Sequence, residues 1–414
     1  MAAIENIIFY IFLFFSTYIQ VFFFVTYLEN RKKIVRRDGK AELRTYPAVT
    51  ITVPCWNEEK TIEKTVQSLL NLNYPKDKLH IFLIDDGSTD GTWEVIKKFE
   101  HESNIKIFHK ENGGKHTALN FGVEHMTTDF FGCLDADSYA HPESLARIMS
   151  YFERDPEVMA VAPSVTVYNP KNIIQKAQEA EYFMGVYFKK MLGFLGAINV
   201  TPGPLTIFRK KVFDDLGPYR HAYNTEDMEI AYRMQANHYK IEHCNDAYVY
   251  TNTPATARKL YKQRLRWIYG FLNNTLDYKN VILRKKYGNF ALFTLPTGII
   301  TVFSVSFFSA QIILNVFDYI SRKVLQFKTV GWSLSPQAPN FDIFFVNTQP
   351  IIVLSVIIYC FIIFSMLFGR RMSEGKWNFS ARMLYFFPIF SVLAPLWLLK
   401  GVYNTIVTKQ PNWR

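Results

Sequence analysis

The stretch at residues 48–88, AVTITVPCWNEEKTIEKTVQSLLNLNYPKDKLHIFLIDDGS, decides the fold. Its β-branched run at 48–56 predicts a strand, and a second apolar run at 80–86 predicts another. Between them, apolar side chains recur at helical spacing over 58–70. A strand, a helix and a second strand in this order are typical of parallel strands with the helix packed across them.

The same alternation continues toward the C-terminus and predicts a helix at 115–125 between strands at 105–111 and 129–137. The repeated order favours an α/β fold with a mostly parallel sheet and helices on both faces. Ligands of such sheets bind beyond the carboxyl ends of the strands. Three of the predicted strands end in polar clusters, at 56–59, 85–87 and 135–137. The motifs GxGxxG and GxxxxGK[ST] are absent, which disfavours a dinucleotide enzyme and a P-loop NTPase.

Paired acidic residues end two of these strands. Asp85 and Asp86 begin DDGSTDG, which is also good turn chemistry. Asp135 and Asp137 are separated by one residue, and alternation along a strand indicates that the second lies on the following turn. Such carboxylates suit Mg²⁺ or Mn²⁺ held together with substrate phosphates, although a capped strand end would use the same residues.

Two further motifs lie closer to the C-terminus. Thr225-Glu226-Asp227 begins an amphipathic segment, where Thr225 could be a helix cap with acids in the first turn. Gln263-Arg264-Leu265-Arg266-Trp267 lies in the basic amphipathic stretch RKLYKQRLRWIYG, which reads alone as a helix on a membrane surface.

Four apolar segments predict membrane spans. Residues 7–28 form 22 residues without a charge, enough to cross a hydrocarbon core. A cleaved signal peptide would need a basic start, a shorter apolar core and a small-residue cleavage site, none of which is present. The others are 290–317, 343–368 and 384–407, the last containing Pro388, Pro395 and Lys400, so that it is either broken or interfacial.

The charge pattern predicts the orientation. The net charge is +11, and five of the cations directly follow the first span, whereas none precedes it: Arg31, Lys32, Lys33, Arg36 and Arg37. Since basic residues stay inside, we expect 29–289 and the loop at 369–383 to be cytosolic and a loop at 318–342 to be outside. The basic balance then reflects membrane topology and anionic lipid rather than a nucleic-acid partner. The aromatic content of 16% excludes a disordered chain, and 4 Cys exclude a disulfide scaffold.

The ordered set of motifs resembles the processive family 2 glycosyltransferases, which include the cellulose, chitin, hyaluronan and poly-N-acetylglucosamine synthases. Their pattern D…DxD…[TG]ED…QxxRW reads here as Asp85/Asp86, Asp135-Ala136-Asp137, Thr225-Glu226-Asp227 and Gln263–Trp267. The resemblance covers nearly the whole chain. The single leading span and the TED form look most like the bacterial poly-β-1,6-N-acetylglucosamine synthases.

The resemblance implies a GT-A (Rossmann-like) cytosolic domain joined to a helical transmembrane bundle. It divides the chain into a transmembrane helix (1–30), a basic linker (31–46), the GT-A domain (47–254), amphipathic interfacial helices (255–289) and a C-terminal region of about three spans (290–414). It also implies inverting, processive transfer from a UDP-sugar, with UDP-GlcNAc the expected donor, to a growing polysaccharide that is passed across the plasma membrane.

Site residues follow from the resemblance position by position. Asp227 is expected to be the general base, with Glu226 beside it in the catalytic motif, and Asp137 to ligate Mg²⁺ or Mn²⁺. Gly203 and Pro204 are expected to line the acceptor site together with Trp267. The nucleotide-sugar-binding set is Pro54, Asn57, Glu58, Asp85, Asp86, Lys115, Asp135, Gln263, Arg266 and Trp267. Trp56 replaces the Tyr that is common before Asn57, and stacking of its ring on uracil is a hypothesis.

Three alternatives remain open at this stage. A transferase of the same fold could move a single sugar to a polyprenyl phosphate, although such enzymes usually lack QxxRW. A membrane transporter with a regulatory cytosolic domain is disfavoured by the small number of spans and by the lack of a charged pathway through them. A small accessory membrane subunit is a further expected partner that the residues do not decide.

Overall fold

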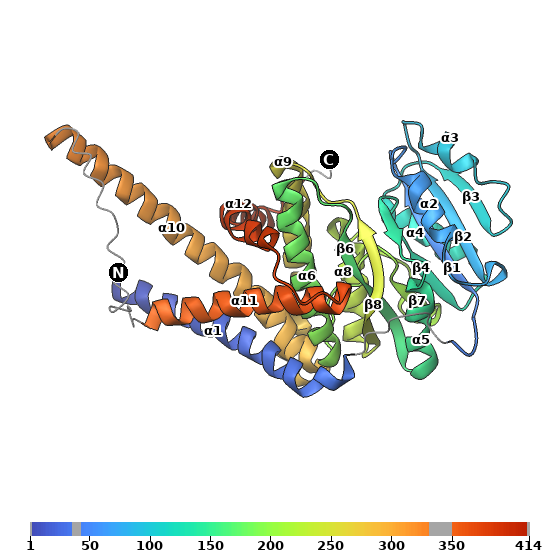
Figure 1. Ribbon diagram of the computed structural model, residues 1–414, viewed down its shortest axis with the longest axis horizontal. Coiled ribbons are helices and arrows are strands. Elements are labelled where there is room, and N and C mark those ends of the chain that lie inside the picture. The colour runs from blue at the N-terminus through green and yellow to red at the C-terminus, as the bar shows by residue number, and fades with distance from the viewer. Residues whose placement is uncertain (1, 35–42, 331–349, 412–414) are drawn as a thin grey trace.

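The computed structural model describes residues 2–34, 43–330 and 350–411, which form a sheet domain and a group of long helices (Figure 1). The sheet domain contains eight strands in the order β3-β2-β1-β4-β7-β6-β8-β5. The bounds are β1 (Val49–Cys55), β2 (Leu79–Asp86), β3 (Ile105–Lys110), β4 (Phe130–Cys133), β5 (Ser138–Ala140), β6 (Val158–Val167), β7 (Ile207–Arg209) and β8 (Lys240–Thr251).

The first four strands are parallel, as the sequence predicts, and the sheet becomes mixed beyond them. β1 pairs in parallel with β2 and β4, and β2 with β3. β7 is antiparallel to β4 and β6, and β5 is antiparallel to β8. The parallel half therefore presents the carboxyl ends of β1, β2 and β4 along one edge.

Helices cover both faces of the sheet. Alternate side chains of β2 point to opposite faces, and both sets are buried. Ile81 and Leu83 pack with α2 (Ile62–Leu70), α3 (Thr92–Lys97) and α5 (Ser144–Arg154) on one face. Phe82 and Ile84 pack with α4 (Lys115–His125), α7 (Lys211–Leu216) and α8 (Glu226–Ala236) on the other. Burial on both sides explains the continuous apolar run at 81–84 in this strand.

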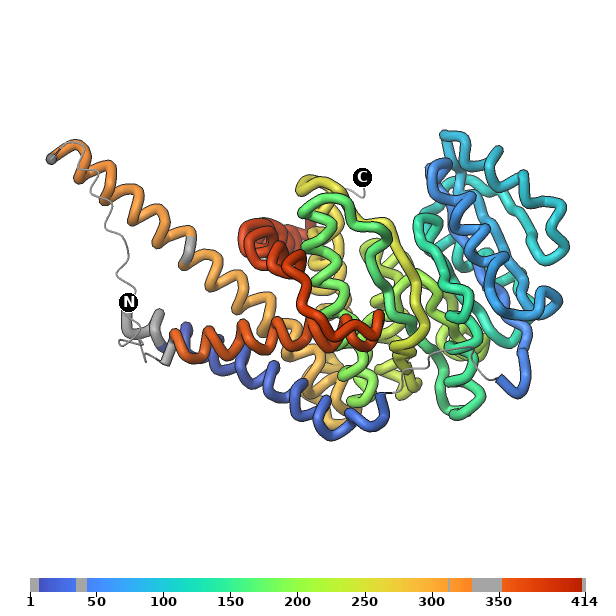
Figure 2. Tube along the Cα trace, in the orientation of Figure 1, coloured from blue at the N-terminus to red at the C-terminus, as the bar shows by residue number. Residues whose placement is uncertain are grey.

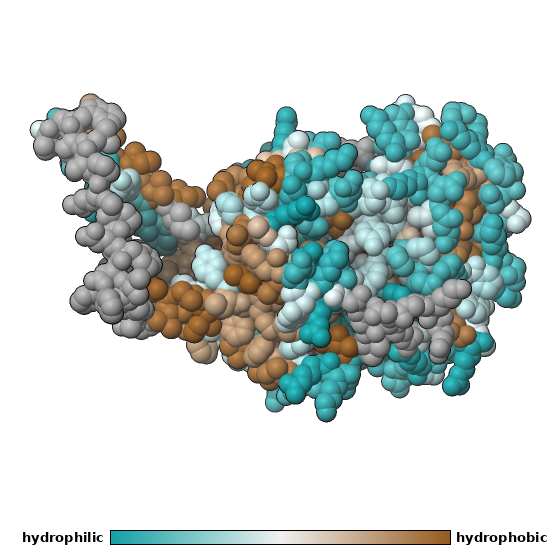
Figure 3. Space-filling model, in the orientation of Figure 1, coloured by the Kyte–Doolittle hydropathy of each residue, from teal (hydrophilic) through white to brown (hydrophobic). Residues whose placement is uncertain are grey.

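Four described helices are long and apolar enough to cross a membrane. They are α1 (Ala2–Asn30), α10 (Leu295–Val330) with the π-turn Phe290–Thr294 before it, α11 (Pro350–Glu374) and α12 (Phe386–Ile406). Figure 3 shows apolar surface over this part of the molecule and polar surface over the sheet domain. Apolar and polar residues are therefore concentrated in different parts of the molecule.

Two predicted boundaries in this region change. α10 continues as a helix to Val330, so the first part of the outer loop predicted at 318–342 is helical. Residues 331–349, which include the predicted start of the third span, lie outside the described residues, as do 35–42 of the predicted basic linker.

The last apolar helix has a different direction from the others. Figure 1 shows α12 nearly end-on, whereas α10 and α11 lie across the view, and the trace in Figure 2 agrees. α12 contains Pro395 but continues through it. Its direction fits the interfacial arrangement that the sequence leaves open, although its length and composition also suit a span.

Two further helices, α6 (Ile173–Phe194) and α9 (Ala257–Asp277), connect the sheet domain to the apolar helices. α6 contacts β6 and β8 as well as α1, α11 and α12, and α9 contacts α8 and α12. Gly369 of α11 packs so tightly on α6 that an added Cβ would lie 1.7 Å from the Phe183 carbonyl oxygen. The remaining short turns are Arg31–Lys33, Lys76–Lys78, Ala222–Asn224, Lys279–Val281, Lys285–Tyr287 and Ala381–Tyr385.

Candidate active site

The carboxyl edge of the parallel strands gathers the first group of predicted residues. Parallel register places Asp85 beside Cys55 of β1 on one side and His109 of β3 on the other. Asp85 is fully buried, accepts the Ser88 amide at 3.2 Å and contacts His109 Nδ1 at 2.7 Å. Asp85, which the sequence predicts to bind the nucleoside, is thus held in place from two sides.

Asp86 organises the glycine loop that leads into α4. Its carboxylate accepts the amides of Gly113 and Gly114 at 3.1 and 2.9 Å and pairs with Lys110. Gly114 has a φ of 90°, a conformation that favours glycine. This loop fixes where α4 begins, at Lys115.

The turn after β1 is built from the predicted Pro-x-x-Asn-Glu residues. Pro54 lies in β1, whereas Asn57 has a φ of 56° and its side-chain oxygen accepts the Thr89 amide at 2.8 Å. The Glu58 amide donates to Thr92 Oγ1 at 2.7 Å. Asn57 and Glu58 therefore join the turns after β1 and β2 into one surface, with the half-buried Trp56 beside it.

Lys115 lies at the centre of the charged cluster. Its amine is 2.6 Å from Asp135 Oδ1 and 3.2 Å from Glu226 Oε1, so it joins the β4 end to the start of α8. Burial by itself would lower the pKa of Lys115, but the surrounding negative groups, led by Asp135 and Glu226, raise it well above its ordinary value. Gly203 lies against the pair, where an added Cβ would come within 2.6 Å of Asp135 Oδ1 and 2.7 Å of Lys115 Nζ. The buried Pro204 follows it in the chain.

Glu226 and Asp227 are neighbours with different electrostatic surroundings. Burial opposes ionisation of Glu226, but Lys115, its own backbone amide and Arg266 together lower its pKa. Burial and the adjacent Glu226 raise the pKa of Asp227 to about 6. The Asp227 carboxylate accepts the Met228 amide at 2.9 Å. Glu226 is thus held as an ion-paired anion, while Asp227 is suited to exchange a proton near neutral pH.

Asp135 and Asp137 both lie beyond β4, as the sequence predicts for Asp137 but not for Asp135. β4 ends at Cys133, so the pair occupies the turn before β5, which places both oxygens at the sheet edge. Burial, followed by the charges of Asp135 and Glu58, raises the pKa of Asp137 to about 7. Repulsion among these carboxylates indicates a place where a cation would be stabilised.

Within the described ranges, no three Asp, Glu, His or Cys side chains converge as a metal cage. The donor set fits instead a hard divalent cation bound by one or two carboxylates and completed by substrate phosphates. Asp137 and Asp135 are the residues that fit this arrangement.

The Gln263–Trp267 motif lies on α9 and faces two different elements. Arg266 donates to the Asn224 carbonyl, directly before the Thr225-Glu226-Asp227 motif. Arg264 pairs with Glu181 of α6, and its guanidinium lies 4.0 Å from the centre of the Trp267 ring. Gln263 Oε1 is buried and accepts no hydrogen bond from any described residue.

Thr225 does not cap α8 with its hydroxyl, which was one alternative interpretation of the motif. Its Oγ1 donates to the Ala222 carbonyl at 2.7 Å and accepts Asn274 Nδ2 at 2.9 Å. The hydroxyl therefore ties the preceding loop to α9.

Some residues that contact the predicted motifs were not predicted from the sequence. His109 and Asn274 contact motif residues, and Lys189 of α6 lies within electrostatic reach of Asp227, with its pKa lowered to about 8 by burial. The register of the strand at 105–111 with 80–86 was a signal that could have identified His109. Asn274 and Lys189 face the site through helix packing, for which the local sequence offers no marker.

The fold and the site together define a class of protein. A GT-A sheet with acidic residues at the carboxyl edge of its parallel strands, joined to apolar helices, defines a membrane-associated glycosyltransferase. The comparisons agree. Residues 50–217 match the family described as Glycosyl transferase family 2. The chain belongs to this family.

Two named relatives are synthases. The chain is 30% identical over 290 residues to poly-beta-1,6-N-acetyl-D-glucosamine synthase of Staphylococcus epidermidis, covering 69% of this chain and 70% of that protein. It is 34% identical over 225 residues to the protein of the same name from Staphylococcus aureus (strain COL), covering 54% of each.

A solved structure shares the fold across nearly the whole chain. The mannosyltransferase PcManGT from Pyrobaculum calidifontis, in complex with GDP-Man and Mn²⁺, has a TM-score of 0.61 and covers 96% of this chain and 99% of its own. At 15% sequence identity, this likeness supports the architecture alone.

Proposed function

We propose that the protein is an inverting, processive glycosyltransferase that builds a β-linked N-acetylglucosamine polymer from UDP-GlcNAc and passes it across the plasma membrane. The main support is that the two adjacent acids at the start of α8 differ in their surroundings. Lys115 pairs with Glu226, while Asp227 keeps a raised pKa beside it. A base of this kind at the carboxyl edge of a GT-A sheet suits transfer to a hydroxyl acceptor.

The reaction proceeds as a single displacement. The acceptor hydroxyl oxygen attacks the anomeric carbon opposite the diphosphate, and its proton passes to an Asp227 carboxylate oxygen. The bond between the anomeric carbon and the UDP oxygen breaks, and UDP leaves with the electron pair. Proton removal by a positioned carboxylate contributes roughly 10²–10⁴-fold. This course needs no nucleophilic Ser or Cys.

Cations around the site offset charge that grows on the leaving diphosphate. Arg266 and Lys115 supply positive charge from α9 and α4. A divalent cation held by Asp137 and Asp135 would act as a Lewis acid on the diphosphate. The Mn²⁺ reported for the mannosyltransferase of the same fold supports a divalent ion, either Mg²⁺ or Mn²⁺.

The proposed donor and product rest on the names of the relatives, which make poly-β-1,6-N-acetylglucosamine. At the proposed site, Asp85, Asp86, Asn57 and Glu58 hold the nucleotide-sugar, and Gly203, Pro204 and Trp267 line the acceptor path. A cytosolic sheet domain is supported by the basic turn Arg31–Lys33 after α1 and by Arg371 in the last turn of α11, because both helices end next to the sheet domain (Figure 1). Packing of α6 and α9 against apolar helices supports an outward path walled by protein.

A donor screen tests this function and its closest rival. Purified chain in lipid nanodiscs receives labelled UDP-GlcNAc, UDP-glucose or GDP-mannose, with Mg²⁺, Mn²⁺ or a chelator. We expect label to be incorporated from UDP-GlcNAc only, and only when Mg²⁺ or Mn²⁺ is present. The labelled product should be a β-1,6-linked polymer that is recovered in the aqueous phase. Label confined to one sugar on an extracted lipid would establish the polyprenyl-phosphate transferase instead. A product formed only after addition of an accessory membrane subunit would show that this partner is required.

A further inference from the structure

The loop before the catalytic motif has an unfavourable backbone. Ala222, Tyr223 and Asn224 have φ values of 41°, 58° and 60°, and none of them is glycine. Residues other than glycine are strained in this left-handed region and persist there only where surrounding contacts determine their conformation. The loop leads directly into Thr225, Glu226 and Asp227, so whatever holds it also fixes the direction in which α8 starts.

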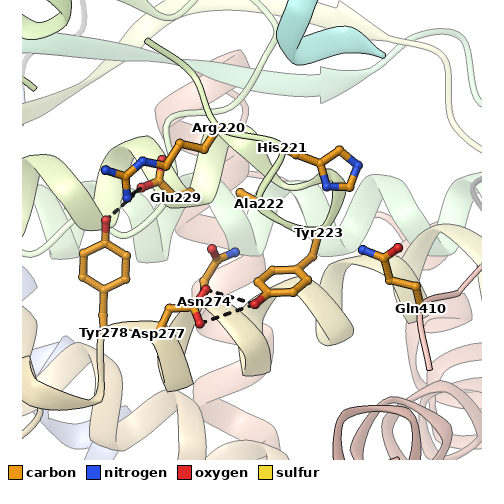
Figure 4. A pocket seen from close by; sticks show the side chains of 9 residues that line it. All are labelled: Arg220, His221, Ala222, Tyr223, Glu229, Asn274, Asp277, Tyr278 and Gln410. Carbon is orange, nitrogen blue, oxygen red and sulfur yellow. Dashed lines mark hydrogen bonds and ion pairs between the residues drawn. The ribbon is translucent and has the colours of Figure 1, made fainter. Parts of the chain in front are cut away.

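The contacts that hold this loop come from α9. Tyr223 Oη donates to the two Asp277 carboxylate oxygens at 3.1 and 3.3 Å (Figure 4). The Tyr223 ring meets the Tyr269 ring edge-on, with their centres 5.8 Å apart. One helical turn before Asp277, Asn274 Nδ2 donates to Thr225 Oγ1 at 2.9 Å. α9 therefore contacts the loop at Tyr223 and again at Thr225, where the catalytic motif begins.

Close packing confirms that α9 and the loop fit one another. An added Cβ at Gly270 would lie 2.3 Å from Thr225 Oγ1, so only glycine allows this approach. Asn274 is fully buried, whereas the Tyr223–Asp277 contact lies at the rim of a pocket of about 550 Å³ that Arg220 and Tyr278 also line (Figure 4). The contact at the rim can thus be removed without opening the core.

We propose that Tyr223, Asp277 and Asn274 are positioning residues, through which α9 holds the strained loop and keeps Asp227 directed at the acceptor hydroxyl. This inference rests on the proposed role of Asp227 as the base. The contacts bear on the start of α8, not on the nucleotide residues at the ends of β1 and β2. Their loss is therefore expected to slow turnover without weakening donor binding.

α12 extends the same arrangement toward the membrane. Asn273 Nδ2 of α9 lies 3.4 Å from Thr405 Oγ1 of α12, and Gly401 of α12 packs on Ile268. α9 is thus fixed by an apolar helix on one side and fixes the catalytic loop on the other.

Steady-state kinetics of purified variants in nanodiscs test the inference. Tyr223→Phe and Asp277→Ala each remove the hydrogen bond and are expected to lower kcat about 3- to 10-fold, with the KM for UDP-GlcNAc within about twofold of wild type. Asp277→Asn keeps an acceptor oxygen for the tyrosine hydroxyl and is expected to restore most of kcat. Tyr46→Phe and Asp77→Ala, at the opposite edge of the sheet, are the matched controls.

The outcomes separate this inference from the proposed function. If Tyr223→Phe and Asp277→Ala turn over like their controls while Asp227→Asn is inactive, the positioning role is wrong and the base assignment stands. An equal loss in Asp277→Asn and Asp277→Ala, or a rise in KM without a fall in kcat, also overturns the positioning role. If Asp227→Asn retains full activity, the proposed function of the site fails first. Asn274→Ser, tested for UDP binding before kinetics, provides a second point at the buried end of the contact.

Discussion

At the scale of single residues, Lys115 determines how the two acids of α8 differ. Its amine lies within ion-pair distance of Glu226 and Asp135, and Gly203 leaves the space that the pair occupies. Because Glu226 takes the positive partner, Asp227 bears the cost of burial beside a negative neighbour. Two adjacent carboxylates thereby acquire different proton affinities, as acid–base chemistry requires.

Asp227→Asn is expected to reduce sugar transfer by roughly 10²–10⁴-fold, because the amide cannot accept the acceptor proton. Initial rates of label incorporation measure the loss, and titration calorimetry with UDP checks that nucleotide binding persists. Asp77→Asn, an exposed aspartate far from the cluster, is the matched control. Full transfer by Asp227→Asn would refute the assignment of this residue as the base.

The raised pKa of Asp227 predicts the pH dependence of turnover. A general base works only when it is deprotonated. We therefore expect kcat to be highest above the pKa of Asp227 and to fall as the pH is lowered through about 6. The profile of kcat at saturating donor measures this, with UDP binding followed at each pH to exclude unfolding. A kcat that stays constant across the pH range in which UDP still binds would contradict the role.

At the scale of elements, α6 and α9 are the supports of the active site. α6 contacts the sheet and the apolar helices, with Tyr187 Oη donating to the Phe23 carbonyl of α1 at 3.1 Å and Lys190 Nζ to the His243 carbonyl of β8 at 2.9 Å. α9 carries Gln263, Arg266 and Trp267 and contacts the catalytic loop. The site therefore depends on helix packing as much as on the sheet.

The α11–α6 crossing predicts the effect of a single methyl group. Ala normally stabilises a helix relative to Gly, but at Gly369 its Cβ would meet the Phe183 backbone. Gly369→Ala is therefore expected to force the helices apart and lower the thermal midpoint of the purified protein. Gly185→Ala in α6, where an added Cβ meets no atom within 4 Å, is expected to leave the midpoint unchanged or higher. Equal midpoints for the two variants would show that this crossing is not tightly packed.

Much of the sheet could be predicted because local sequence determines it. The helix predicted at 115–125 coincides with α4, and the strand predicted at 80–86 with β2 to within a residue. The end of β4 was harder to predict, because Leu134 continues the apolar run although the strand stops at Cys133. Asn274 and Gly270 could not be assigned, since their roles arise only when α9 packs against a loop distant in sequence.

At the scale of the whole molecule, polar and apolar parts are separated in space. A mean hydropathy of −0.01 conceals four long apolar helices beside a polar sheet domain (Figure 3). α1 and α11 run toward the sheet domain, while α10 runs away from it (Figure 1). The basic turn Arg31–Lys33 follows α1, and Arg371 lies in the last turn of α11. This arrangement places basic residues between the apolar helices and the polar sheet domain, where anionic lipid headgroups would lie.

A pulse-chase of the product tests whether the enzyme elongates its polymer processively. Purified chain in nanodiscs receives a short pulse of labelled UDP-GlcNAc followed by excess unlabelled donor, and the molar mass of the labelled material is followed with time. Processive synthesis predicts that the labelled chains grow to high mass while short chains do not accumulate. Label that remains on a single sugar, or on chains that stop growing when the chase begins, would contradict it.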